Sequence, residues 1–271
     1  MMNLLVCVKQ VPDTREIKID PVKNVLIREG VPSVVNPFDG YALEAAARIK
    51  DKAPDTRIVV LSMGPMQAQD ALRECLSIAA DKAYLVSGRG FGGSDTLATS
   101  YILSQAIKKV EETEGPFDAI FCGKQAIDGD TAQVGPEIAE HLHIPQITYG
   151  IEATADARTG TLKVKRETET GYEILQATMP CLVTFTKPSW SVRYPTIARK
   201  LAADQAEIKV LSEEDFPQID KTKIGLSGSP TRVKKTFVPS RQKEGLSIRE
   251  DSAEQTASRL IELLKKKGIS L

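Results

Sequence analysis

The chain has 271 residues, which is long enough to bury a core without disulfides or metals. Its 36 Lys and Arg residues balance 36 Asp and Glu residues, which argues against a broad contact with phosphate backbones, so we expect no nucleic-acid partner. No apolar run approaches the roughly 20 residues that cross a bilayer, and Met1–Val8 enters a strand pattern without a signal-peptide layout. We therefore expect a soluble, cytoplasmic protein with no membrane partner.

Apolar runs alternate with helical periodicity in the first half of the chain. Strands are predicted at Asn3–Lys9, Arg57–Met63, Ala83–Ser87 and Phe117–Cys122. Helices are predicted at Phe38–Ile49, Met66–Ala80, Ser94–Glu114 and Thr131–His141, and a hairpin is predicted at Glu16–Asp20 and Val25–Arg28. This alternation predicts an α/β fold with a doubly wound, mostly parallel sheet.

The second half has a different pattern. Period-two stretches from Gln146 to Thr186, separated by turn signals, predict an antiparallel extension of the sheet. After Trp190 the chain is polar and poorly periodic, and it passes the Gly/Ser/Pro-rich Gly225–Pro230 before an amphipathic helix at Ser252–Lys267. We expect residues 1–224 to form the α/β domain and residues 225–271 to form an arm that packs on a partner.

The cysteines and histidines do not suggest a disulfide or a metal site. His141 and His143 are one residue apart near the end of a predicted helix and cannot both face one metal. The cysteines have no paired spacing and are expected to be reduced core residues: Cys7, Cys75, Cys122 and Cys181. No nucleophile elbow, zincin pair or GxxxxGK loop occurs, so we predict no catalytic side chain and expect a cofactor to supply any chemistry.

Ligands of doubly wound sheets bind beyond the carboxyl ends of the strands. The third strand-end loop, Ser87–Thr96, contains Gly88, Gly90 and Gly93 in a GxGxxG spacing. The next strand ends without the acid that would hold a ribose, so an ordinary Rossmann site is disfavoured. A glycine turn with Ser94 or Asp95 as a helix N-cap is the simpler interpretation.

The fourth strand-end loop, Gly123–Gly135, combines glycines, acids and hydrogen-bonding residues ahead of a helix. Its backbone N–H groups could hold a pyrophosphate, with Asp130 or Thr131 capping the helix or contacting a ribose. The alternative is a solvated turn in which Asp130 only caps the helix.

That loop closely resembles the adenine-nucleotide segment of electron-transfer flavoprotein beta subunits. The resemblance spans nearly the whole chain and includes Val6–Lys9, Asn36–Phe38, Ser62–Pro65, Val164–Glu167, Met179–Pro180 and Arg193–Thr196. It implies an adenine nucleotide alpha hydrolase-like fold and a heterodimer with an alpha subunit that carries FAD. From the composition of the arm, we expect residues from about Gly225 onward to clasp that subunit. Ordinary beta subunits of this family bind AMP, whereas electron-bifurcating members bind a second FAD and oxidise NADH.

The resemblance also implies the residues of the nucleotide site. Asp39 and Met63 stand where AMP-binding members commonly have cysteine, and Lys9–Thr14, Asn36–Asp39 and Ser94–Ser100 are similar to the bifurcating members. FAD is therefore expected in preference to AMP. The implied cofactor-binding residues are Cys7, Lys9, Asn36, Asp39, Met63, Gly64, Ser94, Asp95, Thr96, Gly123, Lys124, Asp130, Thr131, Gln133, Val134 and Gly135.

Arg193, Tyr194 and Ile197 match the family loop that docks a flavin dehydrogenase of the acyl-CoA, enoyl-CoA or lactate type. Ile197 would be an apolar anchor within a charged rim that includes Arg193 and Arg199. The simpler alternative is a surface isoleucine on an ordinary helix turn. Ferredoxin or flavodoxin is the implied low-potential acceptor. The alternatives for the whole chain are an AMP-binding structural subunit and a nucleotide sensor of the universal-stress type.

Overall fold

The structure is a computed structural model that describes residues 2–13, 18–19, 26–27, 32–232, 234 and 245–269. The chain divides into two compact units, Met1–Lys234 and Lys235–Leu271, and each is described by itself. In the described parts of the chain, no helix is both long and apolar enough to cross a bilayer.

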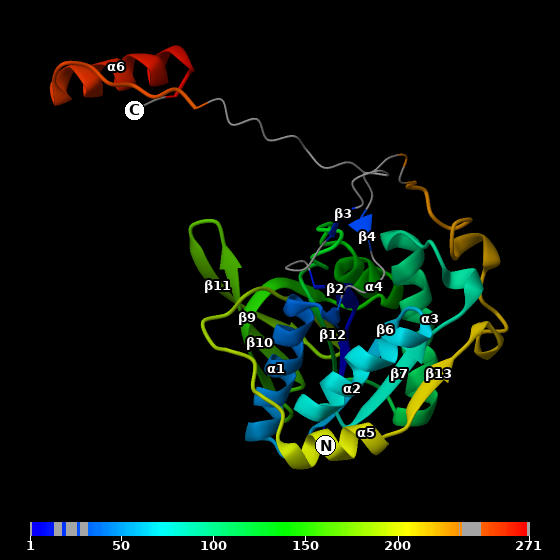
Figure 1. Ribbon diagram of the computed structural model, residues 1–271. Coiled ribbons are helices and arrows are strands. Elements are labelled where there is room, and N and C mark those ends of the chain that lie inside the picture. The colour runs from blue at the N-terminus through cyan, green and yellow to red at the C-terminus, as the bar shows by residue number, and fades with distance from the viewer. Residues whose placement is uncertain are drawn as a thin grey trace. The chain divides into compact units, whose positions relative to one another are not determined.

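The Met1–Lys234 unit is built on a nine-stranded sheet with the order β11-β10-β9-β12-β8-β1-β6-β7-β13 (Figure 1). The strands from β9 to β13 in this order pair in parallel, and β10 and β11 add two antiparallel pairs at one edge. The strands are β1 Asn3–Cys7, β6 Arg57–Met63, β7 Lys82–Val86, β8 Ala119–Gly123, β9 Gln146–Asp156, β10 Thr161–Thr168, β11 Gly171–Thr178, β12 Cys181–Phe185 and β13 Ile208–Leu211. The predicted doubly wound sheet with an antiparallel extension is confirmed.

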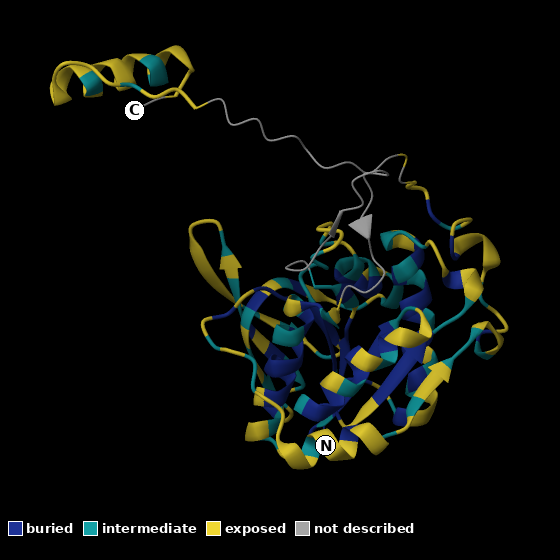
Figure 2. Cartoon of the chain, in the orientation of Figure 1, coloured by how far each residue is buried: buried dark blue, intermediate teal, exposed yellow. Residues whose placement is uncertain are grey.

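Helices cover both faces of this sheet because successive residues of each buried strand point to opposite sides. Leu4 and Val6 of β1 pack in one core with residues of α1 (Pro37–Lys52) and α2 (Gln69–Ile78). Leu5 and Cys7 pack in a second core with residues of α3 (Thr96–Glu114) and α4 (Val134–Leu142). Figure 2 shows the buried strands between partly exposed helices, which explains the continuous apolar runs of the sequence.

Two short antiparallel pairs lie outside the large sheet. β2 (Gln10–Pro12) pairs with β5 (Ser33–Val35), and β3 (Lys18–Ile19) pairs with β4 (Leu26–Ile27). The second pair agrees with the predicted hairpin at Glu16–Asp20 and Val25–Arg28. The other residues of these two stretches lie outside the described part of the chain.

Three elements of the second half differ from the prediction. β12 is a parallel, fully buried strand between β8 and β9, and not part of the antiparallel extension. The stretch after Trp190, which shows little periodicity, contains α5 (Ile197–Gln205) and β13, which pairs with β7 at the sheet edge.

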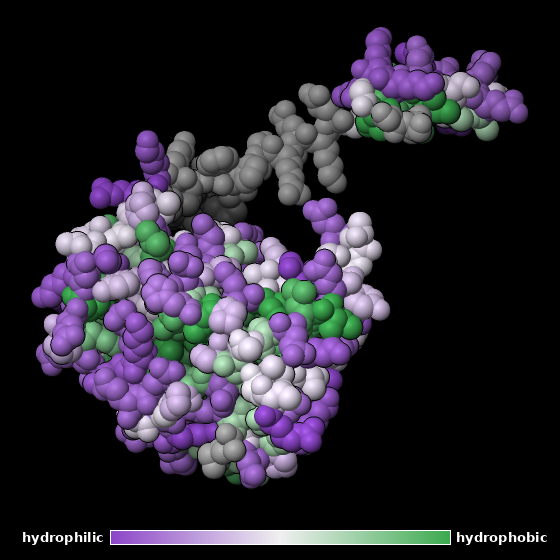
Figure 3. Space-filling view, turned by 180° about the vertical axis from the view of Figure 1, so that it is seen from behind, coloured by the Kyte–Doolittle hydropathy of each residue, from purple (hydrophilic) through white to green (hydrophobic). Residues whose placement is uncertain are grey.

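The boundary of the arm also differs. Gly225–Thr231 belongs to the first unit, because the Gly225 backbone N–H donates to Ser94 Oγ and the Thr231 backbone N–H donates to the Asp95 carboxylate. The second unit contains α6 (Ala253–Lys266), which agrees with the predicted amphipathic helix. Figure 3 shows apolar side chains gathered on one side of α6 and hydrophilic ones on the other.

Candidate functional site

A cleft of about 590 Å³ lies beyond the carboxyl ends of β8, β1, β6 and β7. The chain passes from β1 to β6 and β7 on one side of β1, and then returns to β8 on the other side. The gap between β1 and β8 is therefore the topological switch point, where open α/β sheets bind their ligands. The volume lies within the range of ordinary small-molecule sites.

Asp39 joins the two loops that flank the switch point. Its carboxylate oxygens accept hydrogen bonds from the backbone N–H groups of Lys9 (2.7 Å) and Gly123 (3.0 Å). Only 6% of this residue is exposed. Burial raises the pKa of Asp39 to about 7, against the lowering effect of hydrogen bonds from Asn36, Lys9 and Gly123. Asp39 thus holds the ends of β1 and β8 together at the edge of the cleft.

Asn36 fixes the loop between β8 and α4. Its buried side-chain amide donates to the Gln125 carbonyl (2.8 Å) and accepts from the Ile127 backbone N–H (3.2 Å). Lys9 Nζ adds an ion pair with Asp128 at 2.7 Å across the same gap. These contacts give the long polar loop a defined conformation, so it is not merely a solvated turn.

The helix after this loop begins three residues later than predicted, at Val134. Its N-cap position is Gln133, which makes no side-chain cap bond, so the prediction that Asp130 or Thr131 caps the helix is wrong. Asp130 instead accepts from Gln125 Nε2 at 2.6 Å. Asp130 and Ala132 have φ values of 54° and 55°, an uncommon left-handed backbone that is often found at ligand sites.

The N-terminus of α4 opens into the cleft at Val134 and Gly135. The first N–H groups of a helix have no partner within the helix and favour anions such as phosphate. Packing within the protein explains the glycine at position 135, because a Cβ atom there would lie 2.6 Å from Thr184 Cγ2 of β12. Gly123 likewise allows the close approach of Asp39, whose Oδ1 would lie 2.3 Å from its Cβ.

The opposite wall is the loop between β7 and α3. Glu213 Oε1 accepts from the Gly90 N–H at 2.6 Å, and Cβ atoms at Gly88 or Gly90 would collide with the Glu213 side chain. Gly93, with φ of 75°, packs against Leu226. The GxGxxG spacing is therefore explained by packing within the chain, in agreement with the predicted glycine turn.

Asp95 caps α3 at this wall. Its Oδ1 accepts from the Ala98 backbone N–H at 3.1 Å, which confirms the predicted N-cap. Its Oδ2 accepts from the backbone and the hydroxyl of Thr231. Partial burial raises the pKa of Asp95, but these hydrogen bonds hold it below its ordinary value, so the group is a carboxylate at neutral pH.

The cleft contains apolar residues that the sequence analysis did not identify as site residues: Leu61, Val86, Phe91 and Leu103. Leu61 and Val86 lie at or next to the carboxyl ends of β6 and β7, so the strand prediction could have located them. Cys7 and Cys122 are neighbours on β1 and β8, and a hydrogen bond with Cys7 together with burial raises the pKa of the Cys122 thiol. All four cysteines are free and buried, as expected.

All sixteen predicted cofactor-binding residues line this one cleft. The side chains of three of them already bind groups of the protein itself. Asp39 accepts from the Lys9 backbone N–H, Asn36 donates to the Gln125 carbonyl, and Lys9 forms an ion pair with Asp128. Lys124 Nζ lies over the rings of Phe38 and Tyr149, at 5.0 and 5.8 Å from their centroids. The cleft is also lined by four residues of the same loop that were not predicted individually: Gln125, Ala126, Gly129 and Ala132.

The three predicted docking residues are not among the residues that line the cleft. Tyr194 and Ile197 are 92% and 82% exposed, and Ile197 is the first residue of α5. The guanidinium groups of two expected rim residues, Arg193 and Arg199, bind groups of their own chain.

Comparisons with known proteins agree with this architecture. Residues 23–216 match the Electron transfer flavoprotein domain. The chain is 53% identical over 257 residues to an electron transfer flavoprotein subunit beta of Megasphaera elsdenii, which covers 94% of each chain. It is 44% identical over 268 residues to the caffeyl-CoA reductase-Etf complex subunit CarD of Acetobacterium woodii, covering 99% of this chain and 100% of the relative.

A third relative is protein FixA of Azorhizobium caulinodans, 44% identical over 261 residues, which covers 96% of this chain and 92% of the relative. Such identity over nearly full lengths does not fit a universal-stress nucleotide sensor. The chain therefore belongs to the electron transfer flavoprotein family, as a beta subunit.

Proposed function

We propose that this chain pairs with an electron transfer flavoprotein alpha subunit and that its cleft binds FAD. When bound, FAD would supply the redox chemistry, namely acceptance of a hydride from NADH and delivery of single electrons to ferredoxin or flavodoxin and, through the FAD of the alpha subunit, to a flavin dehydrogenase. The chain itself would contribute binding, orientation and electrostatics.

The cleft has the mixed character that such a dinucleotide requires. One part is apolar and contains Leu61, Val86 and Phe91, which suits a flat aromatic ring system. Another part contains the backbone N–H groups at the start of α4 and the left-handed residues Asp130 and Ala132, which suit phosphate groups. Backbone donors allow a chain with no net charge to bind a diphosphate.

The observation that carries the preference for FAD over AMP is the extent of the cleft. Its lining runs from the loop after β8, across the ends of β1 and β6, to the loop after β7. Neighbouring strands are about 4.8 Å apart, so the four strand ends span roughly 14 Å. A nucleoside monophosphate at the α4 end would leave the apolar part near Val86 and Phe91 uncovered.

The proposed partners are supported by the relatives and by the exposed surface. The relative of Acetobacterium woodii is named as a subunit of a complex with caffeyl-CoA reductase. We extend this to a flavin dehydrogenase that acts on a CoA ester as the partner of this chain. Tyr194 and Ile197 are exposed and apolar in character, as a docking anchor requires.

Anaerobic titration of the purified heterodimer with NADH tests this proposal. NADH should bleach the flavin absorbance, and ferredoxin should be reduced only when NADH and a dehydrogenase with its CoA-ester acceptor are present together. If dithionite bleaches the flavin but NADH does not, the NADH-oxidising function is wrong.

A further inference from the structure

The segment Arg193–Gln205, here called the docking segment, exposes three large side chains. Tyr194, Ile197 and Leu201 are 92%, 82% and 64% exposed. Ile197 and Leu201 are one helical turn apart on α5, so they extend from the same side of the helix. An exposed apolar group is useful for recognition only if its backbone is held in one conformation, because ordering a mobile loop on binding costs free energy.

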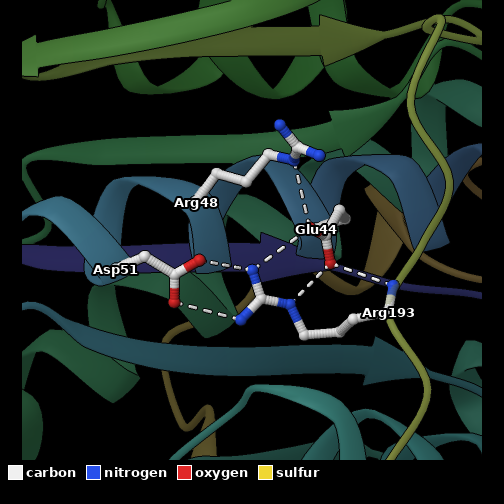
Figure 4. Close-up of polar contacts among 4 residues, drawn as sticks. All are labelled: Glu44, Arg48, Asp51 and Arg193. Atoms are coloured by element: carbon white, nitrogen blue, oxygen red, sulfur yellow. Dashed lines mark hydrogen bonds and ion pairs between the residues drawn. The ribbon is translucent and has the colours of Figure 1, made fainter.

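Glu44 of α1 holds the beginning of this segment, as Figure 4 shows. Its Oε2 accepts from the backbone N–H of Arg193 at 3.2 Å and from Arg193 Nε at 2.8 Å, and its Oε1 accepts from Arg193 Nη2 at 3.1 Å. The same guanidinium donates to both carboxylate oxygens of Asp51 at 3.1 and 2.7 Å. Glu44 therefore fixes both the backbone and the side chain of Arg193.

The two carboxylates differ in burial. The Glu44 side chain is 3% exposed, whereas the Asp51 side chain is 57% exposed. Hydrogen bonds with Asp51 and Glu44 raise the pKa of Arg193 above its ordinary value, so this residue stays charged. Exposed ion pairs contribute little, whereas removal of one partner from a buried pair is costly. Glu44 is thus the stronger of the two anchors.

Two more arginines fix α5 against α2. Arg199 Nη2 donates to the carbonyls of Leu76 and Ala80 at the C-terminal end of α2. Arg73 Nη1 of α2 donates to the carbonyls of Ala203, Asp204 and Ala206 at the C-terminal end of α5. Each helix supplies the cation that satisfies the last carbonyls of the other, a favourable interaction at a helix C-terminus.

We propose that Glu44 is a positioning residue for partner docking, which acts by holding Arg193 so that Tyr194 and Ile197 are presented in a fixed conformation. This inference depends on the proposed docking of a flavin dehydrogenase. It gives Arg193 a role different from the rim contact expected from the sequence. Thr196, whose hydroxyl accepts from the Arg199 N–H at 3.2 Å, continues the same anchoring into the first turn of α5.

Amide hydrogen exchange of the full-length chain in its heterodimer tests the anchoring. Glu44→Gln keeps the size of the side chain but removes its charge, so the hydrogen-bonded amides of Arg193, Arg199 and Lys200 should exchange about tenfold faster or more. Asp51→Asn, the matched control, removes the exposed carboxylate and should change exchange by less than about twofold. Unchanged exchange in Glu44→Gln, or equally faster exchange throughout the sheet, would overturn the inference.

A double-mutant cycle tests the link to docking, with a short-chain acyl-CoA dehydrogenase as the acceptor probe. Glu44→Gln should raise the apparent KM for the dehydrogenase about fivefold, without changing NADH reduction of the flavin. In an Ile197→Ala background, Glu44→Gln should raise this apparent KM by less than about a further twofold. The reason is that both residues act through the contact of Ile197 with the dehydrogenase. Additive effects would show that Glu44 does not act through the anchor. If Ile197→Ala alone has no effect, the docking proposal fails, while the exchange result still decides the anchoring role.

Discussion

Asp39 shows how one buried side chain can shape a binding cleft. Its carboxylate joins the strand ends on both sides of the switch point, and burial raises its pKa to about 7. The sequence resemblance implied that Asp39 binds a cofactor. It could not reveal the hydrogen bonds to Lys9 and Gly123, because these depend on how α1 approaches two strands that are distant in the sequence.

The raised pKa of Asp39 predicts a pH dependence of stability. Between the unfolded pKa near 4 and the folded pKa of about 7, the folded state binds more protons than the unfolded state, so this group's contribution to stability falls as pH rises. Relative to Asp39→Asn, the wild-type chain should lose on the order of a few kcal/mol of unfolding free energy across this window. Urea unfolding at several pH values between 4 and 8 measures this difference. A difference that does not vary with pH would contradict the assigned pKa.

Gly135 provides a second test at the scale of single residues. A Cβ atom would lie 2.6 Å from Thr184 Cγ2, so Gly135→Ala should destabilise the chain by about 1–3 kcal/mol through overpacking. Thr184→Ser removes that methyl group but retains the hydroxyl that accepts from the Tyr149 N–H. The double variant should therefore recover most of the stability lost in Gly135→Ala, as measured by thermal unfolding.

Lys124→Ala is the control for this pair, since the Lys124 ammonium lies over the rings of Phe38 and Tyr149 and takes no part in the Gly135–Thr184 contact. Its unfolding free energy should stay within about 1 kcal/mol of the wild type. If Thr184→Ser fails to rescue Gly135→Ala, the assigned role of the glycine in packing α4 on β12 is wrong.

At the scale of elements, the wall formed by Gly88–Asp95 depends on a segment more than a hundred residues away in the chain. Glu213 binds Gly90, and Ser229 Oγ accepts from the Asp95 N–H at 2.8 Å. The sequence indicated a glycine turn, but the periodicity of one segment cannot show which distant segment packs on it. The same limit applies to β13, whose four residues at a sheet edge are too few to produce a clear alternation.

Glu213→Gln tests the contribution of this wall to ligand retention. The change weakens a charge-assisted hydrogen bond to the Gly90 N–H, so FAD binding should weaken by about 1 kcal/mol, or roughly fivefold in dissociation constant. Glu214→Gln changes the neighbouring exposed residue of the same 3-10 helix and should leave binding unchanged. Equal affinities of the two variants and the wild type, measured by flavin fluorescence, would show that the wall does not affect binding.

Strands and helices of the first half could be predicted because burial on both sides produces unbroken apolar runs and long helices produce clear stripes. β12 is equally apolar, yet its parallel pairing was missed because it follows an antiparallel hairpin directly in the sequence. Which strand becomes its neighbour is a property of the folded sheet. The helix start at Val134 was missed because Asp130 and Thr131 are residue types that often cap helices. In the structure, the backbone at Asp130 and Ala132 is left-handed, so the helix begins later.

At the scale of the whole molecule, the position where the first unit ends changes the design of a truncation. Removal of residues after Ile224 would also remove Ser229 and Thr231, which bind Asp95 at the cleft wall. Truncation after Lys234 leaves these contacts in place. We predict that this shorter chain keeps its cleft and binds FAD but pairs poorly with the alpha subunit, because it lacks the apolar side of α6 (Figure 3).

Size-exclusion chromatography of the truncated chain mixed with the alpha subunit measures this pairing. Truncation after Ile224 should impair both FAD binding and pairing, which separates the two functions of the C-terminal region. Normal heterodimer formation after truncation at Lys234 would contradict the role of the second unit as a clasp.

The central claim is that the cleft at the switch point holds FAD, and the most direct test is to identify the nucleotides released from the purified native heterodimer. Acid release followed by chromatography should yield two FAD molecules per heterodimer and no AMP. Asp130→Ala, which removes the carboxylate that binds Gln125 in the cleft loop, should lower this yield toward one. One FAD together with one AMP per native heterodimer would contradict the account.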